Sequence, residues 1–480
     1  MDTTQIVLFT LLVYKLLLIG VGFWASRRTR DQGDFFIGGR GLGPVVAAIS
    51  YSSSASSAWT LLGMSGLAYV VGVSALWLVV GSVLGMFVAW WWIAPRLMEH
   101  SRQHGQITLT DFILQGCEGG VRRALLWLCS LIIVTSFTLY VAAQFQGAGN
   151  TFASTFGLSM SSSIVTGALI IMVYTLLGGF WAVSVTDTIQ GLLMAAAVLA
   201  LPITALAAVG GWEGFITGLR AASTPQQLSL SAGNAGLLGL GVVLGGTAIG
   251  IGTFGQPHLL VRFMALRDRR ALLQARWISL AWYLVVFGGM FFLGLVGHVL
   301  QAGIDNPENI FFVLTERLFP TALGAVILAA VLSAIMSTAD SQLLVAASAI
   351  AHDLGLGRGN RARQMLASRL TIVALVLVAV LVAIYLPEKI FSRVLFAWVA
   401  LGSAFGPLVF LRLAGCSLQP GAIFASVLTG FALAVVLAQS PLPMLVQRLL
   451  PFALAALVLW VGRVQPQDAR RSVAPPPHSR

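Results

Sequence analysis

The stretch that decides the fold is Ser50-Tyr51-Ser52-Ser53-Ser54-Ala55-Ser56-Ser57-Ala58-Trp59. It lies inside an apolar segment, residues 44–71, that is long enough to cross a membrane, since a helical span needs roughly 20 residues. Six of the eight residues from Ser50 to Ser57 are serines. Hydroxyls and unpaired main-chain groups are costly in lipid, so such a run is tolerated only where it packs against protein or lines a cavity. The serines therefore predict a solute or ion site within the membrane.

The composition is that of a polytopic membrane protein. Of the 480 residues, 58% are apolar and 9% are charged. A soluble protein carries about 25% charged residues. The net charge of +12 comes from basic residues in short loops, which is a topology signal, so we expect no nucleic-acid partner. The sequence implies no obligatory protein partner, and its three cysteines are too scattered for a disulfide framework or a metal site.

Thirteen apolar segments predict thirteen transmembrane helices. They are residues 5–25, 44–71, 74–94, 124–145, 162–181, 188–209, 237–256, 277–299, 320–350, 369–386, 394–411, 420–438 and 443–462. The first contains Lys15 and is followed by an arginine cluster, so we interpret it as a retained span rather than a signal peptide.

Loop charges predict the topology. The loops and tail assigned to the cytoplasm hold 22 arginines, among them Arg262, and the opposite side holds 5 basic residues. This places the N-terminus outside and the C-terminus inside. We expect a transporter domain over residues 1–464 and a disordered cytoplasmic tail over 465–480, which carries three consecutive prolines.

A second irregular run interrupts the segment 237–256. It reads Gly245-Gly246-Thr247-Ala248-Ile249-Gly250-Ile251-Gly252-Thr253-Phe254-Gly255-Gln256-Pro257, a composition that disfavours a regular helix. The two breaks lie five spans apart, so the second unit enters the bilayer from the opposite side. This favours an inverted repeat, about 44–209 against about 237–411, with a site between the breaks. The alternative is that the glycines serve close helix packing.

A third polar cluster, Ser333 to Gln342, lies in the segment 320–350. The hydroxyls of Ser337 and Thr338, with main-chain carbonyls, would form an all-oxygen ligand set that suits a small hard cation. The alternative is that these hydroxyls bond to carbonyls of their own helix. Asp340 is an intramembrane carboxylate and hence a candidate functional group. Alternatively, Asp340 caps a helix or faces a vestibule on the cytoplasmic side.

Two further polar residues have open interpretations. Asp187 lies between the segments 162–181 and 188–209, where it either caps a helix N-terminus or takes part in ion release. Tyr140, in the segment 124–145, either packs in the core or contacts a ligand. The sequence contains no nucleophile–base pair and no metal-ligand cluster, so we expect a carrier and not an enzyme.

Six short motifs recur in order along nearly the whole chain. They are Phe36-Ile-Gly-Gly-Arg40-Gly-Leu-Gly-Pro44; Ser57-Ala-Trp59 with Leu62-Gly-Met64; Gly178-Gly-Phe-Trp-Ala-Val-Ser-Val-Thr-Asp187-Thr-Ile-Gln190; Phe254-Gly-Gln-Pro-His258 with Arg262-Phe-Met264; Ile335-Met-Ser-Thr338 with Gln342-Leu-Leu344; and Ala404-Phe-Gly-Pro407. Together they resemble the sodium/solute symporter family, and within it the proline-carrying branch.

The resemblance implies an all-α polytopic membrane protein with thirteen helices and a leucine-transporter-type five-helix inverted repeat. It implies symport of a small organic solute with Na⁺ across a bacterial inner membrane. By matching position, it implies that sodium is held by the carbonyls of Ser53, Ser56 and Ala334 and the hydroxyls of Ser337 and Thr338. It assigns Ser57, Tyr140, Ile249 and Thr253 to solute binding, and Arg40 and Asp187 to coupling.

The sequence also departs from the proline-carrying branch. That branch has an aspartate where this chain has Ala55, and a tryptophan and a tyrosine at the positions of Ile249 and Thr253. The solute class therefore stays open among amino acids, monocarboxylates, sugars and vitamins. Asp340 falls on a serine of that branch, and we expect it to replace part of the missing acid in coupling. A proton-coupled carrier using Asp340 or Asp187 and a transporter-like sensor remain as alternatives.

Overall fold

The computed structural model describes residues 3–26, 37–177, 179–355, 361–386 and 388–463. Within these residues the chain is helical, and its extended pairing is limited to two isolated bridges, Leu42–Leu266 and Leu418–Arg463. The expected tail, the arginines at 27, 28 and 30, and the motif residues Phe36 and Gly178 lie outside the described residues.

The first half of the chain forms these elements: α1 (Thr3–Ser26), α3 (Pro44–Ala55), the π-helical turn η2 (Trp59–Met64), α4 (Ser65–Val71), α5 (Leu76–Val88), α6 (Ala94–Gln103), α7 (Leu109–Ile113), α8 (Gly119–Phe156), α9 (Met160–Leu177), α10 (Phe180–Ala208) and α11 (Gly211–Ala222).

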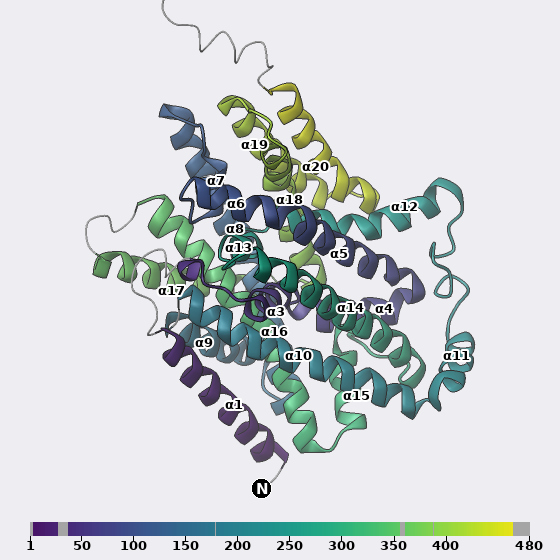
Figure 1. The fold of residues 1–480 in the computed structure, drawn as a ribbon. Helices are drawn as coiled ribbons and strands as arrows, with labels where there is room; N and C mark the ends of the chain where they lie inside the picture. Colours follow the sequence, from purple (N-terminus) through teal and green to yellow (C-terminus); the bar gives the residue numbers. More distant parts are fainter. Residues whose placement is uncertain (1–2, 27–36, 178, 356–360, 387, 464–480) are drawn as a thin grey trace, which may run out of the picture.

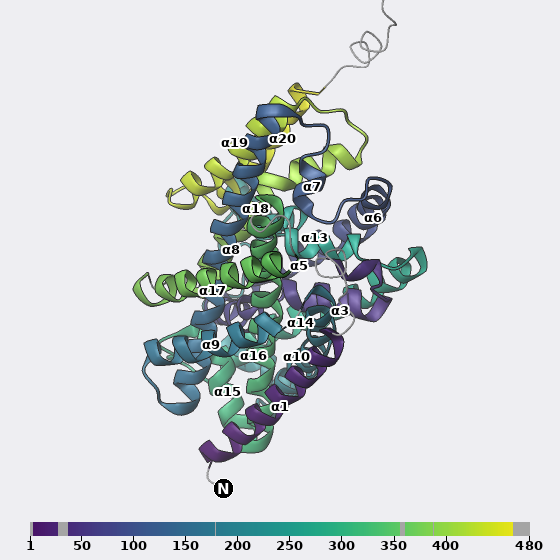
Figure 2. The same cartoon turned by 90° about the vertical axis from the view of Figure 1, so that its left-hand side faces the viewer.

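The second half forms α12 (Gly236–Thr247), the 3₁₀ segment η5 (Ala248–Gly255), α13 (Pro257–Met264), α14 (Arg269–Leu300), η6 (Pro307–Asn309), α15 (Ile310–Leu318), α16 (Thr321–Ser348), the π-helical turn η7 (Ala349–Asp353), α17 (Arg361–Tyr385), α18 (Ile390–Leu413), α19 (Pro420–Ala438) and α20 (Met444–Val461). In Figures 1 and 2, α1 lies at one end of the molecule, α19 and α20 at the other, and α3 and α16 between them.

Both expected helix breaks are confirmed. Helix α3 ends at Ala55, Ser56 leaves the helical region (φ −108°, ψ 75°), and helical structure resumes before Trp59. Helix α12 passes into the 3₁₀ segment η5, and α13 begins at Pro257 after the extended residue Gln256. Proline is favoured in a first helical turn because its missing N–H has no partner there in any case.

The glycines of the second break also allow close helix packing. The packing interpretation of this run is therefore correct in addition to the predicted break. A Cβ on Gly250 would lie 2.2 Å from the carbonyl oxygen of Gly81, and one on Gly252 would lie 1.8 Å from the Trp398 indole. Neither position has room for a side chain.

The described residues contain eleven helical runs long and apolar enough to span a membrane. The expected second and third spans are not counted separately. The residues Trp59–Gln103 form one helical run that bends at Gly72 (φ 71°), and α3, with 12 residues, is too short to be counted as a span by itself. Helix α9 supplies only the shorter apolar stretch Met160–Val173. The chain is thus a multi-pass membrane protein, and the number thirteen stays a prediction.

Helix α16 lies at the centre of the bundle. Of its most apolar stretch 83% is buried inside the protein, against 22% for α1 and for α20. It packs against α3, α8, α10 and α1. The polar residues of α16 therefore have to find partners in protein rather than in lipid.

Candidate functional site

The end of α3 and the middle of α16 meet through hydroxyl–carbonyl contacts. The Ser337 hydroxyl donates to the carbonyl of Ser53 at 3.3 Å, and the Thr338 hydroxyl donates to the carbonyl of Ser54 at 3.0 Å. Both hydroxyls also bond to the carbonyl of Ala334, at 3.3 and 3.1 Å. The expected back-bonding within α16 thus occurs together with contacts across to the broken helix.

This cluster has the donor chemistry of a site for a small monovalent cation. All five residues are fully buried, and the Ser56 hydroxyl beside them has no hydrogen-bond partner within the described chain. The last carbonyls of α3 lie at the negative end of its helix dipole, and those of Ser53, Ser54 and Ala55 accept hydrogen bonds from side chains. In the ranges that the structure describes, no group of three His, Cys, Asp or Glu side chains could hold a metal ion.

A buried ion pair adjoins this cluster, and Ser53 and Ser54 bond directly to it. Asp187 Oδ2 accepts hydrogen bonds from Arg262 Nη2 at 2.8 Å and from the hydroxyls of Ser50 and Ser54 at 2.9 and 3.2 Å. Arg262 Nη2 also donates to Ser54 and to Ser341, at 2.7 and 2.8 Å. The serines of α3 therefore connect α10, α13 and α16 through one polar network.

Two expectations for this network are wrong. Asp187 does not cap a helix, because α10 begins at Phe180, with Gly179 at its N-cap, and Asp187 lies in its second turn. Arg262, counted among the loop arginines, lies within helix α13, where it is 1% exposed and paired with Asp187. Sequence reasoning missed it as a site residue, although its apolar neighbours Val261 and Phe263 were a signal.

Asp340 is buried in the interior of α16, so the capping interpretation of this residue is wrong. Neither of its carboxylate oxygens makes a hydrogen bond of normal geometry within the described chain. Its side chain projects beside the network of Asp187 and Arg262, both of which act on it electrostatically.

A small cavity lies between the two helix breaks. It is lined by Ala55, Trp59, Ser82, Ile249, Thr253, Tyr283, Phe287 and Trp398. The structure therefore brings Ile249 and Thr253 together with the first break. The aromatic walls that sequence reasoning found missing come from other helices, namely Tyr283 and Phe287 of α14 and Trp398 of α18.

The two indoles of this cavity are fixed by main-chain contacts. Trp59 Nε1 donates to the carbonyl of Ala55 at 3.2 Å, and Trp398 Nε1 donates to that of Ile249 at 3.0 Å. Each indole thus caps one of the two broken helices. The ring centroids of Trp59 and Phe287 lie 5.5 Å apart in an edge-to-face arrangement.

Ser57 and Tyr140 lie together at the first break but do not line this cavity. The Ser57 and Tyr140 hydroxyl oxygens are 3.3 Å apart. Gln144 donates to the Ser57 hydroxyl at 3.2 Å and accepts from the main-chain N–H of Ala58 at 3.1 Å. The unwound segment is thereby tied to α8.

Arg40 lies away from the cation cluster. Its guanidinium donates to Ser101, to the carbonyl of Met264 and to the carbonyl of Gln106. These contacts clamp the segment before α3 to α6 and to the end of α13. Arg40 touches none of the other candidate site residues through the hydrogen bonds recorded for it.

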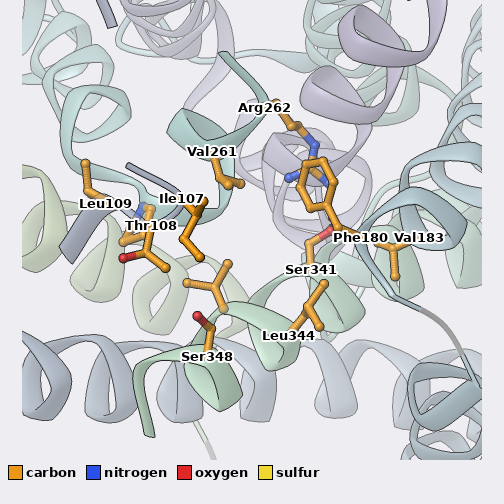
Figure 3. A pocket seen from close by; sticks show the side chains of 12 residues that line it. Ile107, Thr108, Leu109, Phe180, Val183, Val261, Arg262, Ser341, Leu344 and Ser348 are labelled. Carbon is orange, nitrogen blue, oxygen red and sulfur yellow. Dashed lines mark hydrogen bonds between the residues drawn. The ribbon is translucent and has the colours of Figure 1, made fainter. Parts of the chain in front are cut away.

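A larger cavity reaches the ion pair from one side. It is lined by residues 107–109 and by residues of α10, α13 and α16. Figure 3 shows the side chains of Phe180, Arg262 and Ser341 together at one side of it and those of Thr108 and Leu109 across from them. The polar network therefore borders a space outside the cation cluster.

Comparison with known proteins places the chain among cation-coupled transporters. A model of the sodium:solute symporter family matches residues 35–430. The osmoregulated proline transporter OpuE of Bacillus subtilis (strain 168) is 33% identical over 436 residues, which are 89% of this chain and 87% of the relative. The sodium/proline symporter of Staphylococcus aureus (strain JH9) is 35% identical over 416 residues, 84% of this chain and 80% of the relative.

Two solved structures share the fold. A Na⁺-coupled sialic acid symporter in a substrate-bound outward-open state matches with a TM-score of 0.79 and 18% identity, over 96% of this chain and 98% of its own. Mhp1, a nucleobase-cation-symport-1 family transporter, matches in a closed conformation with a TM-score of 0.57 and 14% identity, over 90% and 96%. Both have the leucine-transporter-type fold.

Proposed function

The chain belongs to the sodium:solute symporter family, and from this premise we propose that it imports a small zwitterionic solute of the proline class together with Na⁺. Sodium is the coupling ion of the family. The proline class comes from the names of its relatives, a sodium/proline symporter and an osmoregulated proline transporter. The proposed setting is a bacterial inner membrane, with the N-terminus outside and the C-terminus in the cytoplasm.

The sodium site of the proposal consists of the carbonyls of Ser53, Ser56 and Ala334 with the hydroxyls of Ser337 and Thr338. The contacts between α16 and the end of α3 carry this assignment. Na⁺ is close in size to Ca²⁺, whose ligand distances of about 2.3–2.6 Å separate adjacent octahedral ligands by about 3.3–3.7 Å. Within this set the Ser337–Ser53, Ser337–Ala334 and Thr338–Ala334 oxygen pairs lie 3.1–3.3 Å apart, so an expansion of a few tenths of an ångström would admit the ion.

The solute site of the proposal is the cavity between the helix breaks, extended toward Ser57 and Tyr140. Its aromatic faces suit an apolar ring and a substituted ammonium group. Because both indole N–H groups are bonded to main chain, the remaining polar groups are the hydroxyls of Ser82, Thr253 and Tyr283. None of the residues lining it is charged, which supports a solute with no net charge.

Coupling follows from the position of the sodium site at one of the two breaks. Sodium holds α3 against α16 and so orders the first wall of the solute cavity, which Ala55 and Trp59 provide. An ion can shift a conformational equilibrium only by its difference in affinity for the two states. In this proposal Arg40 clamps the segment before α3, and the Asp187–Arg262 pair links α3 to the cavity of Figure 3.

The proposed energetics are sufficient for accumulation. Entry of one sodium ion down about 100 mV supplies about 2.3 kcal/mol. A tenfold sodium gradient adds about 1.4 kcal/mol, so coupling of one ion to one solute supports accumulation of about 500-fold. The inverted repeat, about 44–209 against about 237–411, accounts for access from either side in turn.

A proton-coupled carrier is the second candidate, because Asp340 is a buried carboxylate whose oxygens make no hydrogen bond of normal geometry in the described chain. Uptake of labelled proline into proteoliposomes at constant pH distinguishes a sodium-coupled from a proton-coupled carrier. The proposal predicts uptake with external Na⁺ and none when choline replaces it. Undiminished uptake in choline would favour the proton-coupled carrier.

A further inference from the structure

Lys15 is a cation within the first membrane helix, and neither the proposed ion site nor the solute site uses it. It lies in α1, outside the proposed repeat, and α1 packs against α10 and α16. Tyr14 beside it is hydrogen bonded to Ser333 of α16, with the two oxygens 2.5 Å apart. Lys15 Nζ contacts the Met336 sulfur, which is only a weak acceptor, and lies 5.6 Å from the centroid of the Tyr14 ring; neither neighbour carries a negative charge.

The nearest acidic partner on that face of α16 is Asp340. Ser333, Met336 and Asp340 are spaced three and four residues apart, so they form one stripe along the helix. The first two of these contact α1, and the third is a buried carboxylate without a hydrogen bond of normal geometry in the described chain. The charge of Asp340 acts on Lys15. Asp187 and Arg262, the other charges near Asp340, are already paired with each other.

We infer that Lys15 is the resident counter-cation of Asp340 and that this pair anchors α1 to the ion-binding helix α16. A lone charge within a membrane is costly, and removal of one member of a buried pair leaves the other uncompensated. Asp340 lies one turn from Ser337 on the same helix. The pair therefore holds α1 against the part of α16 that carries the proposed sodium ligands. The inference goes beyond the proposed function, because it concerns folding of the bundle whatever the transported solute.

Other titratable groups border this pair and have to be distinguished from it. Asp187 and Arg262 act on Asp340 directly. The remaining titratable side chains described on the elements packed against α16 are Tyr14 of α1, Tyr51 of α3, Arg122, Arg123, Cys129 and Tyr140 of α8, His258 of α13, Asp353 of η7, Glu316 and Arg317 of α15, and Arg363, Arg369 and Tyr385 of α17.

A double-mutant cycle tests the inference. Lys15→Met keeps the length of the side chain, and Asp340→Asn keeps its shape, so each single variant removes one charge. Thermal unfolding and sodium-driven uptake of the purified full-length protein are measured for both singles and the double variant, at about pH 5.5 and about pH 7.5. A parallel cycle of Tyr14→Phe with Ser333→Ala removes an uncharged contact between the same two helices.

The inference predicts that Lys15→Met lowers uptake about tenfold at the higher pH and regains most of it at the lower pH, where a proton can neutralise the lone carboxylate. The double variant should unfold at a temperature closer to wild type than Lys15→Met does. The uncharged cycle should show no dependence on pH. The inference would be overturned if the losses of the two charged single variants simply add in the double variant, or if the Lys15→Met variant is insensitive to pH.

The unfolding measurement separates this inference from the proposed function. If proline is not the solute, uptake fails in every variant, and the coupling of Lys15 to Asp340 still appears in the unfolding temperatures. If the sodium assignment is wrong and the pair is right, the double variant still recovers its stability. A variant too unstable to purify at about pH 7.5 but recovered at about pH 5.5 supports the pair, since protonation relieves a lone carboxylate.

Discussion

The hydroxyl oxygen of Thr338 lies 3.0 Å from the main-chain carbonyl oxygen of Ser54, across the contact between α16 and the broken helix α3. The same hydroxyl is 3.1 Å from the carbonyl of Ala334 in its own helix. One side chain therefore joins a regular helix to an unwound one at the place where an ion ligand set is expected. The proposed function depends on this junction.

Removal of either hydroxyl should weaken sodium dependence. We expect Ser337→Ala and Thr338→Ala each to raise the sodium concentration for half-maximal uptake by about tenfold, as loss of a ligand worth about 1.4 kcal/mol would. Uptake by proteoliposomes at graded external sodium measures this. Thr175→Ala is the matched control, because Thr175 is buried and bonds only to the carbonyl of Ile171 in its own helix. Normal sodium dependence in both site variants would show that these two hydroxyls do not bind the sodium ion.

The solute cavity should respond to Thr253 in a different way. Thr253→Trp adds a large side chain to the cavity next to Trp59 and Trp398, so we expect a changed solute preference with little change in sodium dependence. Competition of labelled proline uptake by other small solutes measures the preference. Thr253→Val keeps the size and removes only the hydroxyl. An unchanged competition profile in Thr253→Trp would show that Thr253 does not face the solute.

Gly252 should tolerate no side chain. A Cβ there would lie 1.8 Å from the Trp398 ring, whose indole is held by the carbonyl of Ile249. We expect Gly252→Ala to lower the unfolding temperature and abolish uptake, because overpacking costs about 1–3 kcal/mol. Gly241→Ala on α12 is the control, since a Cβ there meets no atom within 4 Å. Equal stability of the two variants would mean that Trp398 does not pack on the second break.

The buried pair of Asp187 and Arg262 should be essential for folding. Arg262→Met leaves a buried carboxylate unpaired, and we expect a loss of about 3–5 kcal/mol in the free energy of unfolding. Asp187→Asn combined with Arg262→Met should recover part of that loss. The exposed pair of Arg267 and Asp268 serves as a comparison, and Asp268→Asn should have little effect on its own. A harmless Arg262→Met would show that the pair is not formed in the folded protein.

Glu308 should make stability depend on pH. This residue lies outside the membrane-spanning helices. Burial raises the pKa of its carboxyl, and this effect outweighs the hydrogen bonds from the main chain of Phe391 and Ile390, which lower the pKa. The folded protein then holds a proton that the unfolded chain has lost, so the free energy of unfolding falls as pH rises from the unfolded pKa of about 4.3 through the raised folded pKa. Denaturant unfolding at graded pH should show this slope in wild type and not in Glu308→Gln. If the slope persists in Glu308→Gln, another titratable group is responsible for the pH dependence.

The sequence was sufficient to predict features that depend on local composition. The serine run and the glycine run each disfavour a continuous helix, and both breaks occur where they were expected. Ser337 and Thr338 stood out because hydroxyls are costly in an apolar helix, and the structure brings them to the first break.

Features that depend on tertiary placement could not be predicted in the same way. Trp398, Tyr283 and Phe287 resemble ordinary apolar residues of membrane helices, and only the packing of α18 on η5 and of α14 on η2 turns them into cavity walls. Asp187 was misplaced because α10 begins several residues before the apolar segment does. Arg262 was counted as a loop charge because a charge count cannot recognise a buried partner from another helix.

Direct binding of radioactive sodium to the purified protein without solute tests the central claim. The account predicts saturable binding in wild type and in Thr175→Ala, and loss of that binding in the Ser337→Ala/Thr338→Ala double variant at unchanged folding. Undiminished sodium binding by a folded double variant would contradict it.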